Sequence, residues 1–386
     1  MTERLYYRDS YLTDFDANVT DRAEDGRLVY LDRTAFYPTS GGQPHDIGRL
    51  ADIDVVDVVD EGDRIAHRLT APLPDVRVAG RIDWPRRFDH MQQHTGQHLL
   101  SAVLAELYRF ATISVHFGAE TSTLDLDTAA ITPDQVRAAE RRVNAVVTEN
   151  RPVTVAFEDA ATAAGLRKPS DREGPVRIVT IGDLDRSACG GTHVRATGEI
   201  GPILIGKVER VRKSVRLEFL CGQRAVGRAR ADHDLIAHLA TLFSAAPGEL
   251  PALIESLRSE LKSSSAARRE VERELDGLRA RELYAAATPD AAGVRWIVLR
   301  DGGTTERQRS LGQTIASLPG GAFVGTTSSP PGIVVATSED SGTDAAALLR
   351  TALSSVGGRG GGNARLAQGT VPAEALERAI ASVLGR

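Results

Sequence analysis

The sequence predicts a multidomain α+β protein: a small N-terminal β-barrel, an α+β domain with an antiparallel sheet, a long helical segment and a C-terminal α/β domain. Three observations lead to this prediction. The chain has 386 residues, more than a single core normally supports. Short alternating apolar runs dominate its N-terminal part, and helical and strand-like segments mix further on. A leucine-rich stretch with heptad spacing then precedes a last block in which strands and helices alternate.

The first predicted domain spans residues 1–85. It contains the stretch GRLVYLDRTAFYPTSGGQPHDIGRLADIDVVDVVDEGDRIAHRL, in which strand-like pieces are separated by turn residues. Many short strands with turns between them favour a small β-barrel. The following DWPRRFDH ends this domain and opens a helix.

The second predicted domain spans residues 86–230. Helices are expected at about 88–109 and 133–150, the second with Thr132 as its cap and Pro133 at its first position. Strands are expected at TLDLD, VTVAFE, VRIVTIG, GPILIGKVERV and VRLEFLCG. This mixture predicts an α+β domain with an antiparallel sheet.

A helical or coiled-coil linker is expected over residues 231–288. An apolar stripe keeps heptad spacing there except at two polar positions in its middle: Leu250, Ile254, Leu257, Leu261, Val271, Leu275 and Leu278. The stripe fits one long amphipathic helix that lies on its own protein, and equally a helical hairpin or an arm that forms a homodimer. Roughly five heptads do not decide between these alternatives.

The last predicted domain spans residues 289–386. Strand candidates at RWIVLRDG, AFVGTTS and GIVVATS alternate with helices expected at about 306–318, 343–354 and 373–384. The domain also contains GGRGGGNARLAQG. This glycine run lacks the Gly-Lys-Ser/Thr ending of a P-loop, so we do not expect a nucleotide site there.

The composition excludes several classes of protein. The chain is 41% hydrophobic and 26% charged, which is typical of soluble globular proteins. No window approaches eighteen apolar residues, and charges fill the N-terminus, so we expect a cytoplasmic protein without a membrane span or signal peptide. Two cysteines are too few for a disulfide scaffold. One of them, Cys221, stands in an apolar strand-like context and is expected to be buried.

Four residues predict a metal site. In FDHMQQHTGQHLLSAVLAEL, His94 and His98 are four residues apart, so a helix would bring both imidazoles to one face. In CGGTHV, Cys189 and His193 are separated by glycines that allow a tight bend. Together they match the donor number of tetrahedral Zn²⁺. The first motif has no glutamate of the zincin type, which disfavours peptide hydrolysis of that kind, while a purely structural zinc stays possible.

These motifs also carry a family resemblance. HTGQHLLSA followed by CGGTHV resembles the editing domain of alanyl-tRNA synthetases and of the free-standing AlaX trans-editing proteins. The upstream AFYPTSGGQPHDIG is similar to the glycine-rich segment ahead of that domain. The downstream GGRGGGNARLAQG resembles the signature of DHHA1, the C-terminal domain of alanyl-tRNA synthetases. The resemblance covers essentially the whole chain and has the layout of a long-form AlaX protein.

The resemblance implies an aminoacyl-tRNA deacylase that uses Zn²⁺ and acts in trans on tRNA(Ala) mischarged with serine, with glycine as a further candidate. The ester is already activated, so an ordered water and a polarised carbonyl suffice. An alanine site rejects an added hydroxyl poorly, which explains the need for a second, hydrolytic site. The alternative is a non-catalytic tRNA-binding protein with a structural zinc. A DHH-type phosphoesterase is disfavoured because FDHM and ADHD do not match its ligand pattern.

The remaining site predictions concern substrate and RNA. The four zinc ligands are also the candidate catalytic residues. Candidate substrate contacts are Thr95, inside the first motif; His116, either a pocket contact or a core histidine; and Asp185, a ligand-orienting group, an amine contact or a loop cap. A basic run over residues 207–230 suits phosphate contacts, with a solvated sheet face as the alternative. The candidate tRNA contacts are Gly41, Gly42, Gln43, Arg210, Arg212, Lys213, Arg359 and Arg365.

Overall fold

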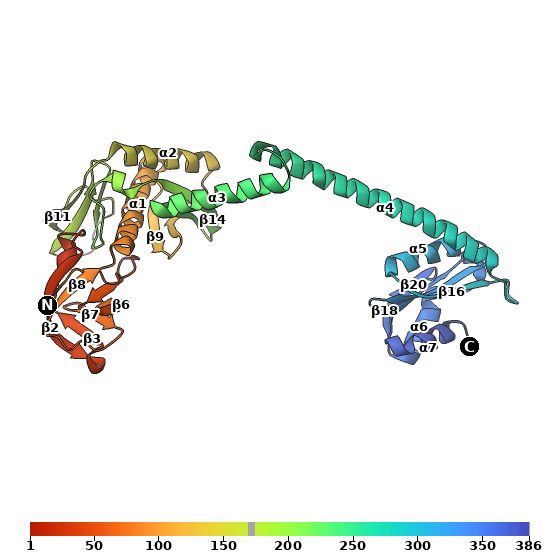
Figure 1. The fold of residues 1–386 in the computed structure, drawn as a ribbon. Helices are drawn as coiled ribbons and strands as arrows, with labels where there is room; N and C mark the ends of the chain where they lie inside the picture. Colours follow the sequence, from red (N-terminus) through yellow and green to blue (C-terminus); the bar gives the residue numbers. More distant parts are fainter. Residues whose placement is uncertain (169–173, 386) are drawn as a thin grey trace. The chain divides into compact units, whose positions relative to one another are not determined.

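The chain forms two units, Met1–Leu242 and Phe243–Arg386, in the computed structural model, which describes residues 1–168 and 174–385 (Figure 1). Each unit has hydrophobic cores of its own. None of the described helices combines the length and apolar character needed to cross a membrane. The predicted multidomain α+β architecture is confirmed.

The N-terminal strands close into a barrel with the order β2-β3-β7-β6-β5-β8, as the sequence predicts. Alternate residues point inward, so that Phe15, Ala17 and Val19 of one strand are buried between exposed neighbours. A short parallel pair lies beside the barrel, and the single-turn helix η1 (Leu5–Tyr7) follows its first strand. The strands are β1 (Glu3–Arg4), β2 (Asp14–Ala23), β3 (Leu28–Leu31), β4 (Arg33–Thr34), β5 (Gly48–Leu50), β6 (Ile53–Asp60), β7 (Ile65–Leu69) and β8 (Arg77–Ile82).

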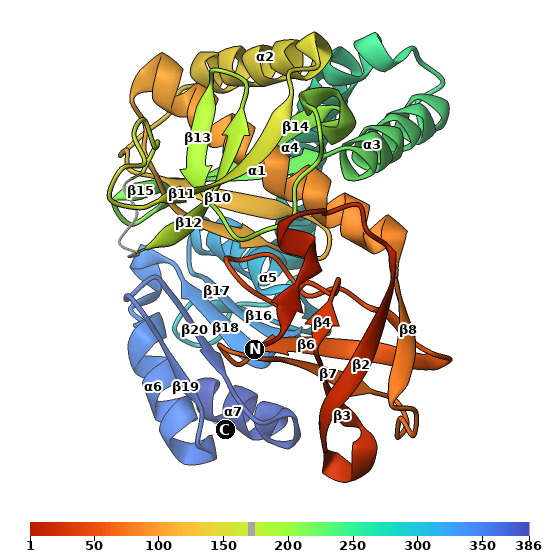
Figure 2. The same cartoon turned by 90° about the vertical axis from the view of Figure 1, so that its left-hand side faces the viewer.

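Helix α1 (Trp84–Tyr108) is the central element of the first unit and runs between the barrel and helix α2 (Pro133–Glu149) (Figure 2). Asp83 caps α1 by accepting a hydrogen bond from the Arg86 N–H, and residues 90–104 are all buried. Thr132 caps α2 in a capping box with Gln135, as the sequence predicts.

Two antiparallel sheets complete the first unit. The four-stranded sheet has the order β14-β15-β10-β9, and the three-stranded sheet has the order β11-β12-β13. Helix α1 lies very close to the first sheet at Gly96. A Cβ atom at this position would be only 2.2 Å from Cys221 Sγ. The strands are β9 (Thr112–Phe117), β10 (Ser122–Leu126), β11 (Val153–Asp159), β12 (Pro175–Ile181), β13 (Asp185–Ala188), β14 (Ile203–Val211) and β15 (Ser214–Cys221), and helix α3 (Gln223–Leu242) follows.

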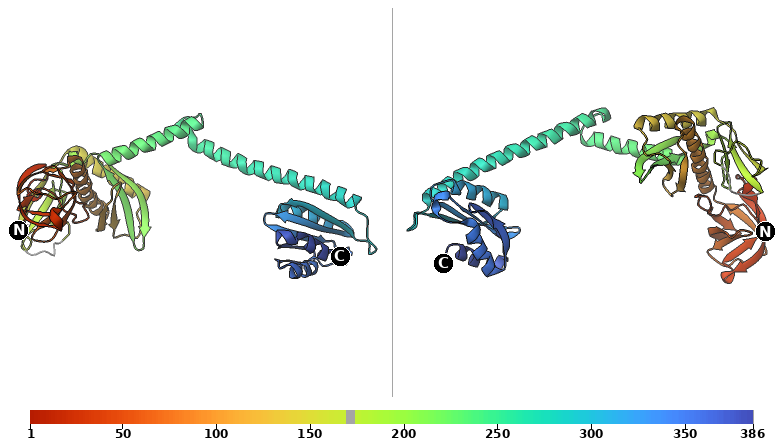
Figure 3. Two further views of the ribbon diagram at one scale, coloured as in Figure 1. Left: turned by 60° about the horizontal axis from the view of Figure 1, so that its bottom comes forward. Right: turned by 180° about the vertical axis from the view of Figure 1, so that it is seen from behind.

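The second unit begins with helix α4 (Leu250–Ala286), so the helical segment forms two helices, with residues 243–249 between α3 and α4. Leu261, Leu275 and Leu278 of the heptad stripe are 70%, 60% and 65% exposed. The five-stranded sheet has the order β16-β17-β18-β20-β19, with α5 and the end of α4 on one face and α6 and α7 on the other (Figure 3). In this sheet, β16 and β17 pair in parallel, and the other neighbouring strands pair antiparallel.

The remaining elements of this unit include a strand that the sequence did not predict. The glycine run forms the edge strand β19, although glycine is a residue of low β-propensity. The elements are β16 (Arg295–Gly303), α5 (Thr305–Ala316), β17 (Gly321–Ser328), β18 (Pro331–Thr337), α6 (Ala345–Val356), β19 (Arg359–Gly362), β20 (Leu366–Thr370) and α7 (Leu376–Val383).

The barrel contains a buried histidine that makes its stability depend on pH. His67 Nε2 lies 2.9 Å from Thr34 Oγ1, and its Nδ1 lies 3.2 Å from the Val29 carbonyl oxygen. Burial lowers the pKa of His67 to about 4. An unfolded histidine titrates near pH 6.5, so between about pH 6.5 and 4 the unfolded chain binds the extra proton and the native state loses stability as the pH falls.

We therefore expect His67 to contribute an acid destabilisation of about 3 kcal/mol over this interval, from the difference between the two pKa values. The variant His67→Gln should lose less thermal stability than the wild type when the pH is lowered from 7 to 4.5. The measurement is the unfolding temperature followed by circular dichroism. The exposed His116→Gln is the control and should behave like the wild type. An equal loss in His67→Gln and wild type would contradict the assignment.

Candidate metal centre

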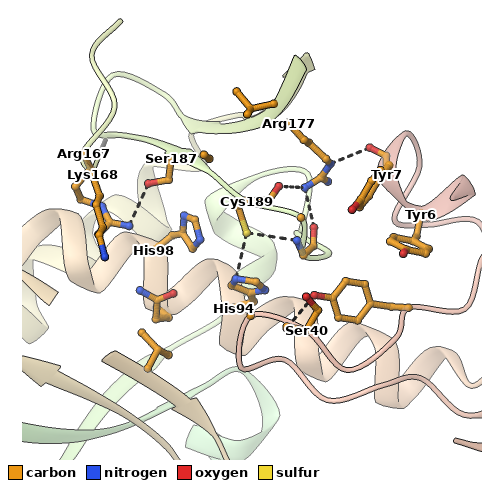
Figure 4. Close-up of a pocket in the computed structure, with 18 of the residues that line it drawn as sticks. Tyr6, Tyr7, Ser40, His94, His98, Arg167, Lys168, Arg177, Ser187 and Cys189 are labelled. Atoms are coloured by element: carbon orange, nitrogen blue, oxygen red, sulfur yellow. Dashed lines mark hydrogen bonds between the residues drawn. The ribbon is translucent and has the colours of Figure 1, made fainter. Parts of the chain in front are cut away.

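The four side chains predicted as ligands converge between α1 and the loop after β13. Figure 4 labels His94, His98 and Cys189 of this set. The ligand atoms of the four all lie within 4.8 Å of one another, and three of the four side chains are buried. Cys189 Sγ lies 3.4 Å from His94 Nε2 and 3.3 Å from His193 Nε2. Ordinary Zn–S and Zn–N bond lengths give a tetrahedral N···S separation of about 3.5 Å. The donor set therefore fits zinc in chemistry and in spacing.

Each imidazole is oriented by a hydrogen bond from its outer nitrogen. This arrangement fixes the ring and directs Nε2 to the centre, as in known metal sites. The Nδ1 atoms lie 2.8 Å from Gln43 Oε1 for His94, 2.9 Å from Asp185 Oδ2 for His98 and 3.1 Å from Thr95 Oγ1 for His193.

Asp185 is the charged member of this outer layer. Burial raises its pKa, but the hydrogen bond with His98 and the neighbouring Arg167 outweigh burial, so the pKa lies below the usual value. Arg167 Nε donates to one carboxylate oxygen at 2.6 Å, and Ser187 Oγ donates to both. Burial lowers the pKa of His98, but Asp185 and Cys189 outweigh burial and raise this pKa to about 9. Of the roles considered for Asp185, the contacts match orientation of a ligand.

Gln43 lies at this centre and not on an RNA-facing surface. We predicted Gln43 as a tRNA contact together with Gly41 and Gly42, yet its side chain is 1% exposed. Besides accepting from His94, the amide donates to Thr192 Oγ1 at 2.8 Å. On the same side, a Cβ atom at Gly191 would lie 2.1 Å from His94 Cε1, so only glycine fits there. The loop that carries Gln43 and the loop that carries Gly191 thus both contact His94.

The two cysteines have opposite environments. Burial raises the pKa of the Cys189 thiol, but His94 and His193 outweigh it and hold the pKa well below its usual value. Burial and His94 together lower the pKa of His193 to about 3, so this ring is neutral. Cys221 is fully buried, as expected, and burial raises its pKa. Only Cys189 has the character of a thiolate ligand.

A cavity of about 700 Å³ opens beside the centre. Gln97 and Thr112 line it, and both donate to Ser101 Oγ, at 2.8 and 2.7 Å. The Thr112 proton is used in its bond, so its lone pairs remain as acceptors, whereas Gln97 keeps its amide oxygen and one of its two N–H donors. The sequence analysis missed both residues. The position of Gln97 between two ligands was an available signal, whereas nothing local marks Thr112.

None of the three predicted substrate contacts, Thr95, His116 and Asp185, belongs to the lining of this cavity. Thr95 is fully buried, and its hydroxyl is occupied by His193 Nδ1 and the Val194 N–H. His116 is exposed on β9, so it is neither a core histidine nor part of the cavity wall. The lining along this strand covers residues 112–115.

The other predicted RNA contacts are mostly on the surface. Gly41 and Gly42 are exposed, and Gly41 also lines the cavity. Exposed basic residues stand at the turn between β14 and β15 and on the second unit: Arg210, Arg212, Lys213, Arg359 and Arg365. Arg365 donates to the Ser338 carbonyl at 2.6 Å, which leaves it partly committed to its own fold.

Comparison with known proteins relates part of this unit to a described domain. Residues 176–217, which include Cys189 and His193, match the domain described as "Threonyl and Alanyl tRNA synthetase second additional domain". The chain thus carries an accessory domain of tRNA synthetases. The alanyl-tRNA editing protein AlaX-L of Pyrococcus horikoshii is 34% identical over 287 residues, which cover 70% of each chain. The chain belongs to the alanyl-tRNA editing proteins.

Longer relatives align with both units. An alanine–tRNA ligase of Methanoculleus marisnigri is 36% identical over 401 residues, which cover 98% of this chain and 42% of the ligase. The chain therefore spans less than half the length of that relative. The crystal structure of the C-Ala domain from Aquifex aeolicus alanyl-tRNA synthetase is 20% identical and covers 24% of this chain and 91% of that chain. Its TM-score is 0.20, too low to support a structural argument.

The outer hydrogen bonds predict how zinc affinity responds to substitution. The variants Gln43→Leu and Asp185→Asn should each weaken zinc binding about 10- to 100-fold. The first removes the hydrogen-bond acceptor of His94, and the second removes the negative charge of the acceptor of His98. Competition with a chromogenic chelator measures this affinity. The exposed His116→Leu is the matched control and should bind zinc like the wild type. Unchanged affinity in both outer variants would show that the ligand positions do not depend on these bonds.

Proposed function

We propose that this chain hydrolyses the ester of Ser-tRNA(Ala) in trans, with Gly-tRNA(Ala) as a second substrate, at a Zn²⁺ site formed by His94, His98, Cys189 and His193. As an alanyl-tRNA editing protein, the chain is an aminoacyl-tRNA deacylase. The observation that carries the finer proposal is the convergence of the four oriented donors beside a cavity with polar walls. The substrate is an intermediate of translation, which agrees with action in the cytoplasm.

The chemistry needs little from the chain beyond positioning. Bound zinc supplies a Lewis acid that polarises a carbonyl and promotes loss of a proton from water. Gln43 and Asp185 hold two of the imidazoles, so their Nε2 atoms stay directed at the position that the metal would take. Cys189, as a ligand, is not available as a covalent nucleophile, and an activated ester does not require one. The walls of the cavity then select the acyl group.

The zinc ligands provide the direct test of this function. We expect about one zinc per chain in the wild type and release of serine from Ser-tRNA(Ala). The variants Cys189→Ala and His98→Ala should lose metal and hydrolysis together. Metal analysis and deacylation assays on the same preparations measure both quantities. Full activity in the metal-free double variant would overturn the zinc proposal. A zinc-loaded wild type that leaves the ester intact would favour the alternative, a tRNA-binding protein with a structural zinc.

Gln97 and Thr112 are our proposed readers of the serine hydroxyl. Both residues line the cavity and keep acceptor capacity beyond their bonds to Ser101, and a seryl hydroxyl would be a donor to them that an alanyl group lacks. A site that bonds a hydroxyl rejects the analogue that lacks it strongly, here on the order of 10³-fold. Glycine lacks the hydroxyl too, so its release should be slower than that of serine.

We expect wild-type protein to strip Ser-tRNA(Ala) under conditions in which Ala-tRNA(Ala) survives. Thr112→Val and Gln97→Leu should lower kcat/KM for the seryl substrate about tenfold, because an acceptor for its hydroxyl is removed, while zinc stays bound. His116→Leu, outside the cavity, is the control. If neither variant changes the serine-to-alanine ratio, the hydroxyl is read by another group. If the wild type cleaves both substrates at one rate, editing is not its activity.

The tRNA itself is proposed to contact basic residues on both units. The exposed cluster Arg210, Arg212 and Lys213 supports a contact near the ester, together with Gly41 and Gly42 at the glycine-rich turn. In the second unit, Arg359 and Arg365 flank the glycine run. Phosphate contacts release counterions, so their number determines how steeply affinity falls with salt.

A chain that ends at Leu242 lacks the second unit. We expect it to bind tRNA(Ala) more weakly than the full chain and with a shallower salt dependence, and to retain hydrolysis at high substrate concentration. The full-length double variant Arg359→Gln/Arg365→Gln should reproduce part of this loss without any truncation. Filter binding at several salt concentrations measures both effects. Equal affinity and equal slope in all three proteins would remove the proposed RNA contact of this unit.

Homodimerisation through the helical or C-terminal region is a further part of the proposal. The exposed heptad stripe of α4 supports it, since Leu257, Leu261 and Leu275 are 49%, 70% and 60% exposed. The same stripe suits an arm that covers another part of its own chain. Sedimentation equilibrium distinguishes a dimer from a monomer.

A further inference from the structure

The buried carboxylate of Asp185 needs a compensating positive charge. Its side chain is fully inaccessible, and Oδ2 lies 2.9 Å from Nδ1 of His98. A buried carboxylate is costly unless charges and hydrogen bonds around it compensate for the lost water. A histidine binds a metal in its neutral form, so in the zinc-bound site this charge does not come from His98. Another side chain therefore has to supply it.

Arg167 carries the charge that Asp185 needs. Its Nε donates to Asp185 Oδ1 at 2.6 Å, and its Nη2 donates to Ser187 Oγ at 3.1 Å. The same serine hydroxyl lies 3.1 and 3.0 Å from the two carboxylate oxygens. Within residues 1–168 and 174–385, Arg167 is the one arginine or lysine paired with Asp185. Figure 4 shows Arg167, Ser187 and His98 on one side of Cys189.

These contacts fix the orientation of the carboxylate. A guanidinium is planar and its N–H groups have fixed directions, so an arginine that bonds both Asp185 and Ser187 restricts rotation of the carboxylate. Arg167 holds Oδ1, which leaves Oδ2 directed at Nδ1 of His98. A lysine ammonium is a point charge and lacks this planar fork. The arrangement therefore depends on the shape of the arginine as well as on its charge.

The main chain at Arg167 is anchored to the strand that carries Asp185. Arg167 lies on the segment 160–168, which follows β11, and its N–H donates to the Arg186 carbonyl at 2.8 Å. Arg186 is next to Asp185 in β13, and its side chain donates in turn to the Ala164 carbonyl. The guanidinium is thus placed beside the carboxylate by contacts within the protein, before any substrate binds.

We propose that Arg167 is a positioning residue of the metal centre, which holds Asp185 and through it orients His98 towards the position of the zinc ion. The hydrogen bonds of its side chain go to Asp185 and Ser187, and none goes to a ligand among the residues that the structure describes. This inference rests on the proposed zinc-dependent function and deepens it. Arg167 also lines the cavity, so the rival role is a direct contact with the substrate.

A double-mutant cycle in zinc affinity tests this role on the full chain. Arg167→Met removes the guanidinium and should weaken zinc binding about tenfold. Arg167→Lys keeps the charge without the fork and should lose about threefold. In the Asp185→Asn background, Arg167→Met should cause no further loss, because the carboxylate through which it acts is absent. Competition with a chromogenic chelator measures all of these affinities. Wild-type affinity in Arg167→Met, or the same loss in both backgrounds, would overturn the proposal.

Kinetics at saturating zinc separate positioning from a direct contact with the substrate. If Arg167 positions the centre, Arg167→Met should lower kcat for release of serine from Ser-tRNA(Ala) and leave KM unchanged. If Arg167 binds the substrate directly, the same variant should raise KM while zinc affinity stays at the wild-type value. The second result would overturn the proposal.

The controls separate this role from folding and from the proposed function. Arg49→Met removes an arginine that donates to Asp54 at 2.8 Å on the barrel, and it should bind zinc and release serine like the wild type. The unfolding temperatures of the metal-free proteins report on folding. If Arg167→Met does not fold, the cycle is run with Arg167→Lys, which retains the charge. A wild type that binds no zinc is a separate result, which would overturn the proposed function.

Discussion

The buried ion pair between Arg87 and Asp46 fixes the position of the metal centre, because it joins the barrel to the helix that carries two of the ligands. Both side chains are almost fully inaccessible, and Arg87 Nε lies 3.0 Å from each carboxylate oxygen. The same guanidinium donates to the Ser10 and Ala35 carbonyls. Arg87 is two helical turns before His94, and Asp46 is three residues after Gln43. Loss of one partner would leave an uncompensated buried charge, which costs about 3–5 kcal/mol, so the barrel loop and α1 stay together.

A second buried arginine, Arg177, fixes the position of the loop that carries Cys189. Arg177 Nη1 donates to the carbonyls of Cys189 and Gly191, both at 2.8 Å, and its Nε donates to the Tyr7 carbonyl at 2.9 Å. Burial lowers the pKa of Arg177, and the nearby Cys189 opposes that effect. The loop is thus tied to η1. The centre and its outer hydrogen bonds lie where the barrel meets the rest of the first unit.

The sequence predicted those parts of the structure that follow from local periodicity. Alternating apolar residues predicted the barrel, a spacing of four placed His94 and His98 on one helix face, and Thr132 with Pro133 marked the start of α2. The outer hydrogen bonds could not be predicted in this way, because Gln43 and His94 are 51 residues apart and only tertiary packing joins them. A glutamine after two glycines is equally suited to RNA and to a buried histidine. Likewise, nothing in ISVHFG shows that the cavity wall along β9 stops before His116.

The glycine run of the second unit shows how packing and recognition can be separated within one motif. A Cβ atom at Gly360 would lie 2.4 Å from the Gln368 carbonyl oxygen, and one at Gly362 would lie 2.3 Å from that of Leu366. These two glycines are therefore required by the pairing of β19 with β20, whatever the strand binds. At Gly361 the same atom would meet nothing within 4 Å. Sheet geometry does not explain this glycine, which lines a cavity of about 330 Å³ together with Arg359. Gly361 is therefore the glycine of the run at which the proposed contact with RNA backbone has room.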